Sequence, residues 1–347
     1  MTDLRTEELD FVIPDSCIAT QPASPRDSAR LMVVPLDGSA VQHRVVRDLP
    51  DILFPNDTLV LNHTRVLPAR FHTTRHDSGG GVEGLFLQEV NGRWQCFLKA
   101  GGRLTPGLKL DWFEGQHLVL DEPAKEGWWV RPEPAGSPEG LLAAGGATPL
   151  PPYIRKARKD RAESFADATD RDWYQTVFGD GRAASVAAPT ASLHLTPELL
   201  QQFNTLRVEL EVGAGTFKPV TTDRLADHPM HTERCHVPRA TLVGLPQATR
   251  RIAVGTTALR TLESLPSPLP TEDWSAETDV LIMPGHTFRW ADGLLTNFHL
   301  ARSTLLALVA AFTGIDRLRD LYHEAVHEGY RFHSYGDAML LLPGDHS

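Results

Sequence analysis

Residues 58–131 carry short apolar runs separated by turn residues, a pattern typical of strands rather than helices. Two of these runs flank Asn91 and Gly92, and Asn-Gly supplies the two positive-φ residues that a type I′ hairpin turn needs. No segment of this block has a helical period, so the close spacing of its strands predicts a small antiparallel β-barrel. Strands are expected at residues 58–61, 69–72, 85–90, 93–98, 109–113, 117–120 and 127–130.

Outside that block, β-prone runs alternate with helical runs. Thr196 and Pro197 are typical of a helix start, as N-cap and first-turn residues, and Gly314 is typical of a helix end. Alternating strands and helices predict an α/β domain with a mostly parallel sheet and flanking helices. Strands are expected at residues 11–13, 31–34, 206–212, 251–254 and 279–283, and helices at residues 256–264, 303–312 and 316–328.

The change of pattern along the chain predicts its domain organisation. Residues 1–55 and 149–347 are expected to form one discontinuous α/β catalytic domain. Residues 56–148 are expected to form the small antiparallel β-barrel, inserted into that domain. A segment rich in Pro and Gly, residues 132–152, is the expected return linker.

Composition narrows the class of protein. The chain has 347 residues, and 34 Lys and Arg against 44 Asp and Glu leave a formal net charge of −10. The longest uncharged apolar run, residues 305–312, is far too short for a membrane span, and the first residues lack a signal-peptide pattern. The three cysteines lie far apart, without zinc-site spacing or an even disulfide set. These features predict a cytoplasmic protein with reduced thiols, no bound metal and no membrane contact.

Small and hydroxyl-bearing residues follow several predicted strands. In open α/β sheets, ligands bind at the carboxyl ends of strands, where loops and helix starts converge. Together these strand ends predict a cleft for a polar small molecule. Its expected lining comes from three segments: Gly213, Gly215 and Thr216; then Thr256, Thr257 and Arg260; then Asn297, His299 and Ser303.

Two further features indicate chemistry. His194 lies beside Thr196 at an element start, and histidine is the natural proton carrier near neutral pH. Residues 155–161 form a basic strip in an acidic protein, preceded by Tyr153. Either the strip is a solvated helix face, or its Lys and Arg side chains contact nucleic-acid phosphates, and charge pattern alone leaves both readings open.

Several common motifs are absent from the sequence. It contains no phosphate-binding G-x-x-x-x-G-K-[ST] loop, no G-x-G-x-x-G after the first strand, no H-E-x-x-H and no G-x-S-x-G. These absences disfavour a nucleoside triphosphatase, a dinucleotide dehydrogenase, a zinc protease and an α/β-hydrolase. The residues themselves therefore predict an α/β enzyme with a polar cleft and a local basic strip.

Ordered sequence strings run along nearly the whole chain. They include LNHTRV at 61–66, PLPPYI at 149–154, VAAPTA at 186–191, DGLLTNFHL at 292–300 and YGDAM at 335–339. In this order they resemble the S-adenosylmethionine:tRNA ribosyltransferase-isomerase family of the queuosine pathway. The resemblance implies an α/β domain interrupted by a β-barrel, in agreement with the segmentation above.

The resemblance also implies a reaction. The family moves the ribosyl group of S-adenosylmethionine onto 7-aminomethyl-7-deazaguanine at the wobble position of tRNA and isomerises it. The products are epoxyqueuosine, adenine and methionine. S-adenosylmethionine is then a co-substrate, tRNA is the partner, and no metal or redox cofactor is implied.

Residue chemistry within this family reading assigns roles to individual positions. The catalytic set is His194, Thr196, His63 and Glu211. The substrate-binding set is Asn62, Arg65, Gly213, Gly215, Thr216, Thr256, Thr257, Arg260, Asn297, His299 and Ser303. The tRNA-binding set is Tyr153, Arg155, Lys156, Arg158 and Lys159.

The chain departs from the family pattern at polar positions. His63 stands where the family usually has Asp, Glu211 where it has His, and Ser192 where it has Gly. Either His63 and Glu211 have exchanged charges across one site, or the activity has drifted. The second reading is a divergent paralogue that binds RNA or a nucleoside without catalysing ring transfer.

Overall fold

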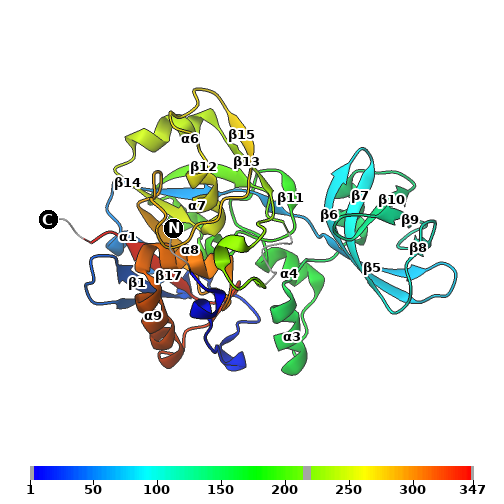
Figure 1. Ribbon diagram of the computed structural model, residues 1–347, viewed down its shortest axis with the longest axis horizontal. Coiled ribbons are helices and arrows are strands. Elements are labelled where there is room, and N and C mark those ends of the chain that lie inside the picture. Colours follow the sequence, from blue (N-terminus) through cyan, green and yellow to red (C-terminus); the bar gives the residue numbers. More distant parts are fainter. Residues whose placement is uncertain (1–3, 214–219, 345–347) are drawn as a thin grey trace.

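A nine-stranded sheet and a separate closed barrel organise the protein. In this computed structural model, which describes residues 4–213 and 220–344, the barrel stands to one side of the larger α/β body (Figure 1). The predicted fold class, an α/β domain interrupted by a small antiparallel barrel, is confirmed.

The main sheet draws strands from both ends of the chain. Its order is β15 (Trp274–Thr278), β13 (Glu233–Val237), β12 (Asn204–Leu210), β3 (Asp57–Asn62), β14 (Arg250–Val254), β16 (Gly293–Asn297), β17 (Ala338–Leu342), β1 (Arg30–Pro35) and β2 (Gln42–Val45). The β12–β3, β3–β14 and β14–β16 pairs in the centre are parallel, as is the β17–β1 pair. The β16–β17 pair and the pairs at both edges are antiparallel, so the sheet is mixed.

Strand β3 corrects the predicted boundary of the insertion. Residues 58–61 were expected in the barrel block, but β3 pairs with β12 and β14 in the centre of the main sheet. All six of its residues are buried. A run buried on both faces belongs to a central parallel strand, and this physical requirement outweighs its proximity in sequence to the barrel strands.

Helices cover both faces of the main sheet. One face packs against α6 (Arg239–Gly244), α7 (Thr256–Glu263), α8 (Thr304–Thr313) and α9 (Ile315–His327). The other packs against α1 (Leu49–Ile52) and α5 (Pro197–Leu200). Alternate residues of each strand supply the two cores: Met32 and Val34 face one layer, Leu31 and Val33 the other.

The barrel closes with antiparallel pairs. Its strands are β5 (Arg70–Arg75), β6 (Gly81–Val90), β7 (Arg93–Ala100), β8 (Lys109–Asp111), β9 (His117–Pro123) and β10 (Trp128–Glu133). The predicted hairpin is present between β6 and β7, where Asn91 and Gly92 both have positive φ. The barrel strands thus occupy residues 70–133, a narrower span than the predicted insertion of residues 56–148.

The connection between the two parts contains regular structure. β4 (Arg65–Val66) pairs with β11 (Ala183–Ser185) where the chain leaves the body for the barrel (Figure 1). The return segment, expected to be a linker, contains α2 (Pro138–Gly145) and leads into α3 (Pro152–Asp160) and α4 (Asp167–Trp173). Ser137 caps α2 by accepting from the amide of Gly140, which stabilises a helix inside this Pro- and Gly-rich stretch.

Two predicted strands are wrong. Residues 279–283 and 11–13 form neither strand nor helix. Their apolar side chains nevertheless pack against the core, including Ile13, Val280 and Ile282. A short apolar run indicates burial, and only pairing with a neighbour makes it a strand.

Candidate active site

A pocket opens at the carboxyl ends of β14 and β16, where α7 and α8 begin. Gly255 has a φ of +89°, a backbone conformation that favours glycine, and it turns the chain from β14 directly into α7. The first amides of α7 have no partner within the helix, which gives this wall donors as well as hydroxyls. We call this the central pocket, and its polar lining is Tyr153, Thr190, Thr256, Thr257, Thr296, Asn297, His299, Ser303, His333 and Ser334.

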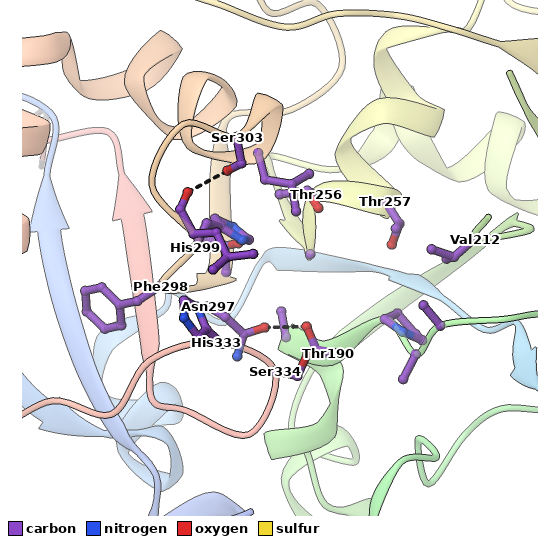
Figure 2. Close-up of a pocket in the computed structure, with 18 of the residues that line it drawn as sticks. Thr190, Val212, Thr256, Thr257, Asn297, Phe298, His299, Ser303, His333 and Ser334 are labelled. Atoms are coloured by element: carbon purple, nitrogen blue, oxygen red, sulfur yellow. Dashed lines mark hydrogen bonds between the residues drawn. The ribbon is translucent and has the colours of Figure 1, made fainter. Parts of the chain in front are cut away.

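A hydrogen-bonded chain orients Asn297 on the pocket wall. Thr190 donates to the Asn297 Oδ1 over 2.7 Å, and the Asn297 amide lies 3.2 Å from the His194 Nε2. Figure 2 shows the Thr190–Asn297 bond on one side of the pocket and Thr256 and Thr257 at the start of α7. Burial lowers the pKa of His194 to about 4, so the ring is neutral at pH 7 and its Nε2 accepts from Asn297.

His194 therefore lies behind the wall. Proton transfer was predicted for this ring, but the pocket lining includes Asn297 and excludes His194. Its observed contact is with the Asn297 amide nitrogen, so His194 helps to orient that side chain on the wall. Thr196 is not part of the lining either, because it caps α5 by accepting from the Leu199 amide at 3.2 Å.

Two other imidazoles do reach the pocket. His299 is hydrogen-bonded through Nε2 to the Thr296 hydroxyl at 2.7 Å, and burial lowers its pKa to about 3. Burial also lowers the pKa of His333 to about 4. The His333 Nδ1 is buried and has no hydrogen-bond partner among residues 4–213 and 220–344. Both rings are neutral at pH 7, which suits recognition of uncharged heteroatoms.

The hydroxyl groups of Ser303 and Thr257 in the central pocket differ in whether they already have hydrogen-bond partners. Ser303 donates to the Leu300 carbonyl and accepts from the Leu306 amide, so it serves mainly as the N-cap of α8. The Thr257 hydroxyl is buried and unpartnered in the described part of the chain. An unpaired buried polar group is costly, and a ligand in the pocket would satisfy it.

Arg260 does not line the central pocket. It forms a buried ion pair with Glu233, whose other carboxylate oxygen accepts from the Gly213 amide at 3.0 Å. The predicted residues Gly215 and Thr216 lie outside the described residues. Of the predicted substrate-binding residues, the central pocket unites Thr256, Thr257, Asn297, His299 and Ser303.

The remaining predicted residues on the body have other contacts. Asn62 uses its side-chain amide to join β3 to the backbone of Leu210, so its role is structural. His63 contacts Asp180 at 2.9 Å and Glu209 at 3.8 Å. The acidic neighbours of His63 are thus Asp180 and Glu209. A charge exchange between His63 and Glu211 was one of two readings of the sequence, and these contacts do not support it.

Glu211 and Arg65 lie in a cleft between the barrel and the body. We call it the barrel cleft; β6, β7 and the start of α2 form one side, and Arg65, Arg182, Glu211 and Arg234 form the other. Burial is the main cause that raises the pKa of Glu211, partly offset by Arg234. In the described part of the chain, no guanidinium group of these three arginines forms an ion pair, although the Arg182 backbone amide donates to Glu209 at 3.3 Å.

The basic strip lies on α3, and most of its charges are already paired. Arg158 is 8% exposed and binds both oxygens of Asp170 at 2.7 and 2.8 Å. Arg155 binds Glu83 of the barrel at 2.6 Å, and Lys156 lies 3.3 Å from Asp160. The expected phosphate contact is therefore wrong for Arg158, because its donors are buried and occupied.

Tyr153 has a different place from the rest of the strip. It lines the central pocket, with its hydroxyl 2.6 Å from that of Ser334 and its ring 4.7 Å from the His333 ring. The sequence patterns did not mark His333, Ser334 and Thr190 as lining residues. His333 and Ser334 directly precede the YGDAM string and Thr190 lies inside VAAPTA, so the strings pointed to the right segments without marking these side chains.

The described residues contain neither a metal-ligand cluster nor a membrane-spanning helix. No group of three or more His, Cys, Asp and Glu side chains in residues 4–213 and 220–344 could hold a metal ion. Within the same residues, no helix is long and apolar enough to cross a membrane.

Comparison with known proteins identifies relatives over the full length. A family model described as queuosine biosynthesis protein matches residues 6–341. The chain is 45% identical over 352 residues to the S-adenosylmethionine:tRNA ribosyltransferase-isomerase of Rubrobacter xylanophilus, covering 99% of both chains. It is 43% identical over 357 residues to the protein of that name from Gloeobacter violaceus, covering 99% of this chain and 97% of the other.

A solved structure agrees with these relatives. The S-adenosylmethionine tRNA ribosyltransferase of Thermotoga maritima is 31% identical, with a TM-score of 0.53, over 96% of this chain and 100% of that one. The family resemblance predicted from the sequence strings is confirmed. The chain belongs to the queuosine biosynthesis protein family.

Proposed function

We propose that the protein transfers and isomerises the ribosyl moiety of S-adenosylmethionine onto 7-aminomethyl-7-deazaguanine at the wobble position of tRNA. The products are epoxyqueuosine, adenine and methionine. The observation that carries the proposal is 45% identity over 99% of the chain to a relative named for this activity. A tRNA substrate also favours the cytoplasm as the place of action.

The central pocket supports this chemistry as a nucleoside site. Its polar groups are amide, hydroxyl and neutral imidazole, which suit the adenine and ribose of S-adenosylmethionine. The Thr257 hydroxyl and the His333 Nδ1, both unpartnered within the described chain, are available to the ligand. The Thr190–Asn297–His194 chain holds one amide in a fixed orientation, which favours a defined pose for the leaving base.

The sulfonium of the co-substrate drives the reaction. Its positive charge acidifies the adjacent 5′ carbon, so a base can remove a proton there, and a donor at the adenine assists its departure. The neutral rings of His299 and His333 offer acceptor nitrogens on this wall. His194 contributes by orienting Asn297.

The barrel cleft is the better surface for tRNA than the α3 strip. Arg65, Arg182 and Arg234 lie exposed along the cleft, and none of their guanidinium groups forms an ion pair within the described chain. Arg forks of this kind bind phosphates, and such contacts position an RNA without reading its sequence. Lys156 and Lys159 on α3 stay candidates for further, weaker contacts.

One incubation tests the activity. Protein, S-adenosylmethionine and tRNA carrying the deazaguanine precursor are combined, and mass spectrometry follows free adenine and epoxyqueuosine. We expect both products in equal amounts. Neither product, with retained tRNA binding, would support the divergent paralogue, which full-length identity to proteins named as enzymes does not favour.

Salt dependence tests the RNA surface. Replacing Arg65, Arg182 and Arg234 by Ala should lower the slope of log affinity for tRNA against log salt by about 0.7–0.9 for each phosphate that the protein no longer neutralises. The matched control replaces Lys156 and Lys159 by Ala, and we expect a smaller change. An equal or larger change of the slope in the control would indicate that α3, and not the barrel cleft, contacts the tRNA phosphates.

A further inference from the structure

A second pocket lies next to the central one, built by the same two helices. On α7, Thr256 and Thr257 line the central pocket and Arg260 lines the second. On α8, Thr304 and Leu308 line the second pocket. Leu305 lines both, so the two pockets are neighbours on either side of one side chain.

A buried ion pair forms the polar part of the second pocket. Arg260 and Glu233 are 7% and 6% exposed, and they pair with each other. The Arg260 Nε donates to the Val280 carbonyl at 3.3 Å, but its Nη2 is buried without a partner in the described chain. The buried Nδ1 of His228, also on this pocket, is likewise unpartnered there.

These unpartnered atoms point to a ligand. A buried guanidinium nitrogen without an acceptor is costly, and a carboxylate placed against it would form a charge-assisted hydrogen bond. Glu233, already accepting from the Gly213 amide, offers its charge to a cation beside that carboxylate. One positive and one negative group side by side match the carboxylate and ammonium of an α-amino acid.

The apolar part of the second pocket completes the match. Met230, Ile282, Leu305 and Leu308 surround the charged pair and suit an aliphatic, sulfur-bearing chain. S-adenosylmethionine is an elongated molecule with a nucleoside at one end and a methionine at the other. Two neighbouring pockets, one neutral and polar and the other zwitterionic and apolar, correspond to these two ends.

We propose that the second pocket binds the α-amino-acid end of S-adenosylmethionine, with Arg260 on its carboxylate and Glu233 on its ammonium, while the central pocket holds the nucleoside. This inference rests on the proposed function. It places the sulfonium near Leu305, between the two pockets.

A ligand series on the unaltered protein tests the proposal by calorimetry. The series is S-adenosylmethionine, decarboxylated S-adenosylmethionine and 5′-methylthioadenosine, which lacks the amino-acid end. Loss of the carboxylate should weaken binding about 10- to 100-fold, the effect of one charge-assisted hydrogen bond. Equal affinity for all three ligands would overturn the inference while leaving the proposed function intact, provided that turnover persists. If S-adenosylmethionine itself fails to bind, both this inference and the proposed function are overturned.

Two variants assign the effect to the ion pair. Arg260→Lys keeps the charge but loses the fork, and Glu233→Gln keeps the shape but loses the charge. Both should bind 5′-methylthioadenosine as the unaltered protein does, which also reports folding. Arg260→Lys should lose most of the discrimination against the decarboxylated ligand, and Glu233→Gln should weaken S-adenosylmethionine about tenfold. In variants that still bind 5′-methylthioadenosine, unchanged discrimination in Arg260→Lys would exclude Arg260 as the carboxylate partner. Unchanged affinity for S-adenosylmethionine in Glu233→Gln would exclude Glu233 as the ammonium partner.

Discussion

Two buried arginine–carboxylate pairs in this protein have different surroundings. Arg158 on α3 uses each of its donor nitrogens: two bond to Asp170, one bonds to the Thr20 carbonyl at 3.0 Å, and the guanidinium lies over Phe165. Arg260 on α7 pairs with Glu233 but leaves one nitrogen unpartnered in the described chain, beside a pocket. The two pairs are similarly buried. The hydrogen bonds of Arg158 are complete, whereas Arg260 keeps one donor nitrogen that a ligand could bind.

This contrast separates structural from functional charge. A pair whose hydrogen bonds are complete has nothing left to offer a substrate, however basic its sequence neighbourhood. A pair with a spare donor on a cavity keeps binding capacity at a cost in stability. From the sequence, Arg158 was predicted to bind RNA and Arg260 to bind substrate, and only their contacts in the folded protein distinguish the two residues.

Breaking the complete pair should have the largest effect. Asp170→Asn leaves Arg158 buried without a counter-charge, so the free energy of unfolding should fall by about 3–5 kcal/mol in urea titrations. The double variant Arg158→Met with Asp170→Leu should recover most of that loss, because an apolar pair needs no compensation. If the double variant loses as much free energy of unfolding as Asp170→Asn, the ion pair contributes to stability beyond compensating its own two buried charges.

Breaking the incomplete pair should cost less stability. Glu233→Gln also leaves an arginine without its counter-charge, but Arg260 gives one hydrogen bond to Glu233 whereas Arg158 gives two to Asp170. We expect a decrease in the free energy of unfolding of about 1–3 kcal/mol. Urea titrations of Glu233→Gln and Asp170→Asn under identical conditions measure the difference, and equal losses would show that the number of hydrogen bonds to the carboxylate does not determine the loss.

The third prediction concerns pH: acidification should lower the free energy of unfolding through His194. Because burial lowers the folded-state pKa of His194 to about 4, the unfolded chain takes up this proton first, near pH 6.5. Stability is therefore complete above about pH 6.5 and falls as the pH drops towards 4, by about 1.4 kcal/mol per pH unit for this histidine.

The measurement is the free energy of unfolding at several values between pH 7 and pH 4. His194→Gln should flatten the slope by about one proton. His327→Gln, on the exposed side of α9, is the matched control and should leave the slope as it is. A slope that is unchanged by His194→Gln would contradict the buried neutral ring.

The exposed charges of α3 should matter least. Lys156 and Lys159 lie on the surface, and Lys156 has only exposed carboxylates near it. Replacing both by Ala should change the free energy of unfolding by no more than about 0.5 kcal/mol. A loss as large as that of Asp170→Asn would erase the distinction between the surface and the buried charges of this helix.

Local signals in the chain were enough to predict the fold class, the family and several pocket segments. Periodicity marked β12, β14, α8 and α9, and Asn91 with Gly92 marked the hairpin, because these signals depend on neighbouring residues alone. Glycine and hydroxyl residues after strands marked Thr256, Thr257 and Asn297, because strand ends in an α/β sheet converge on one edge.

Which polar groups are occupied depends on the packing of distant segments. Asn62, Thr196 and Ser303 bond to backbone, Arg158 bonds to Asp170, and His194 stands behind Asn297. Packing also placed β3 in the main sheet and brought Glu233 to Arg260, which lie 27 residues apart. A residue type states what a side chain can bond to, whereas the folded arrangement determines which of those bonds remain available to a ligand.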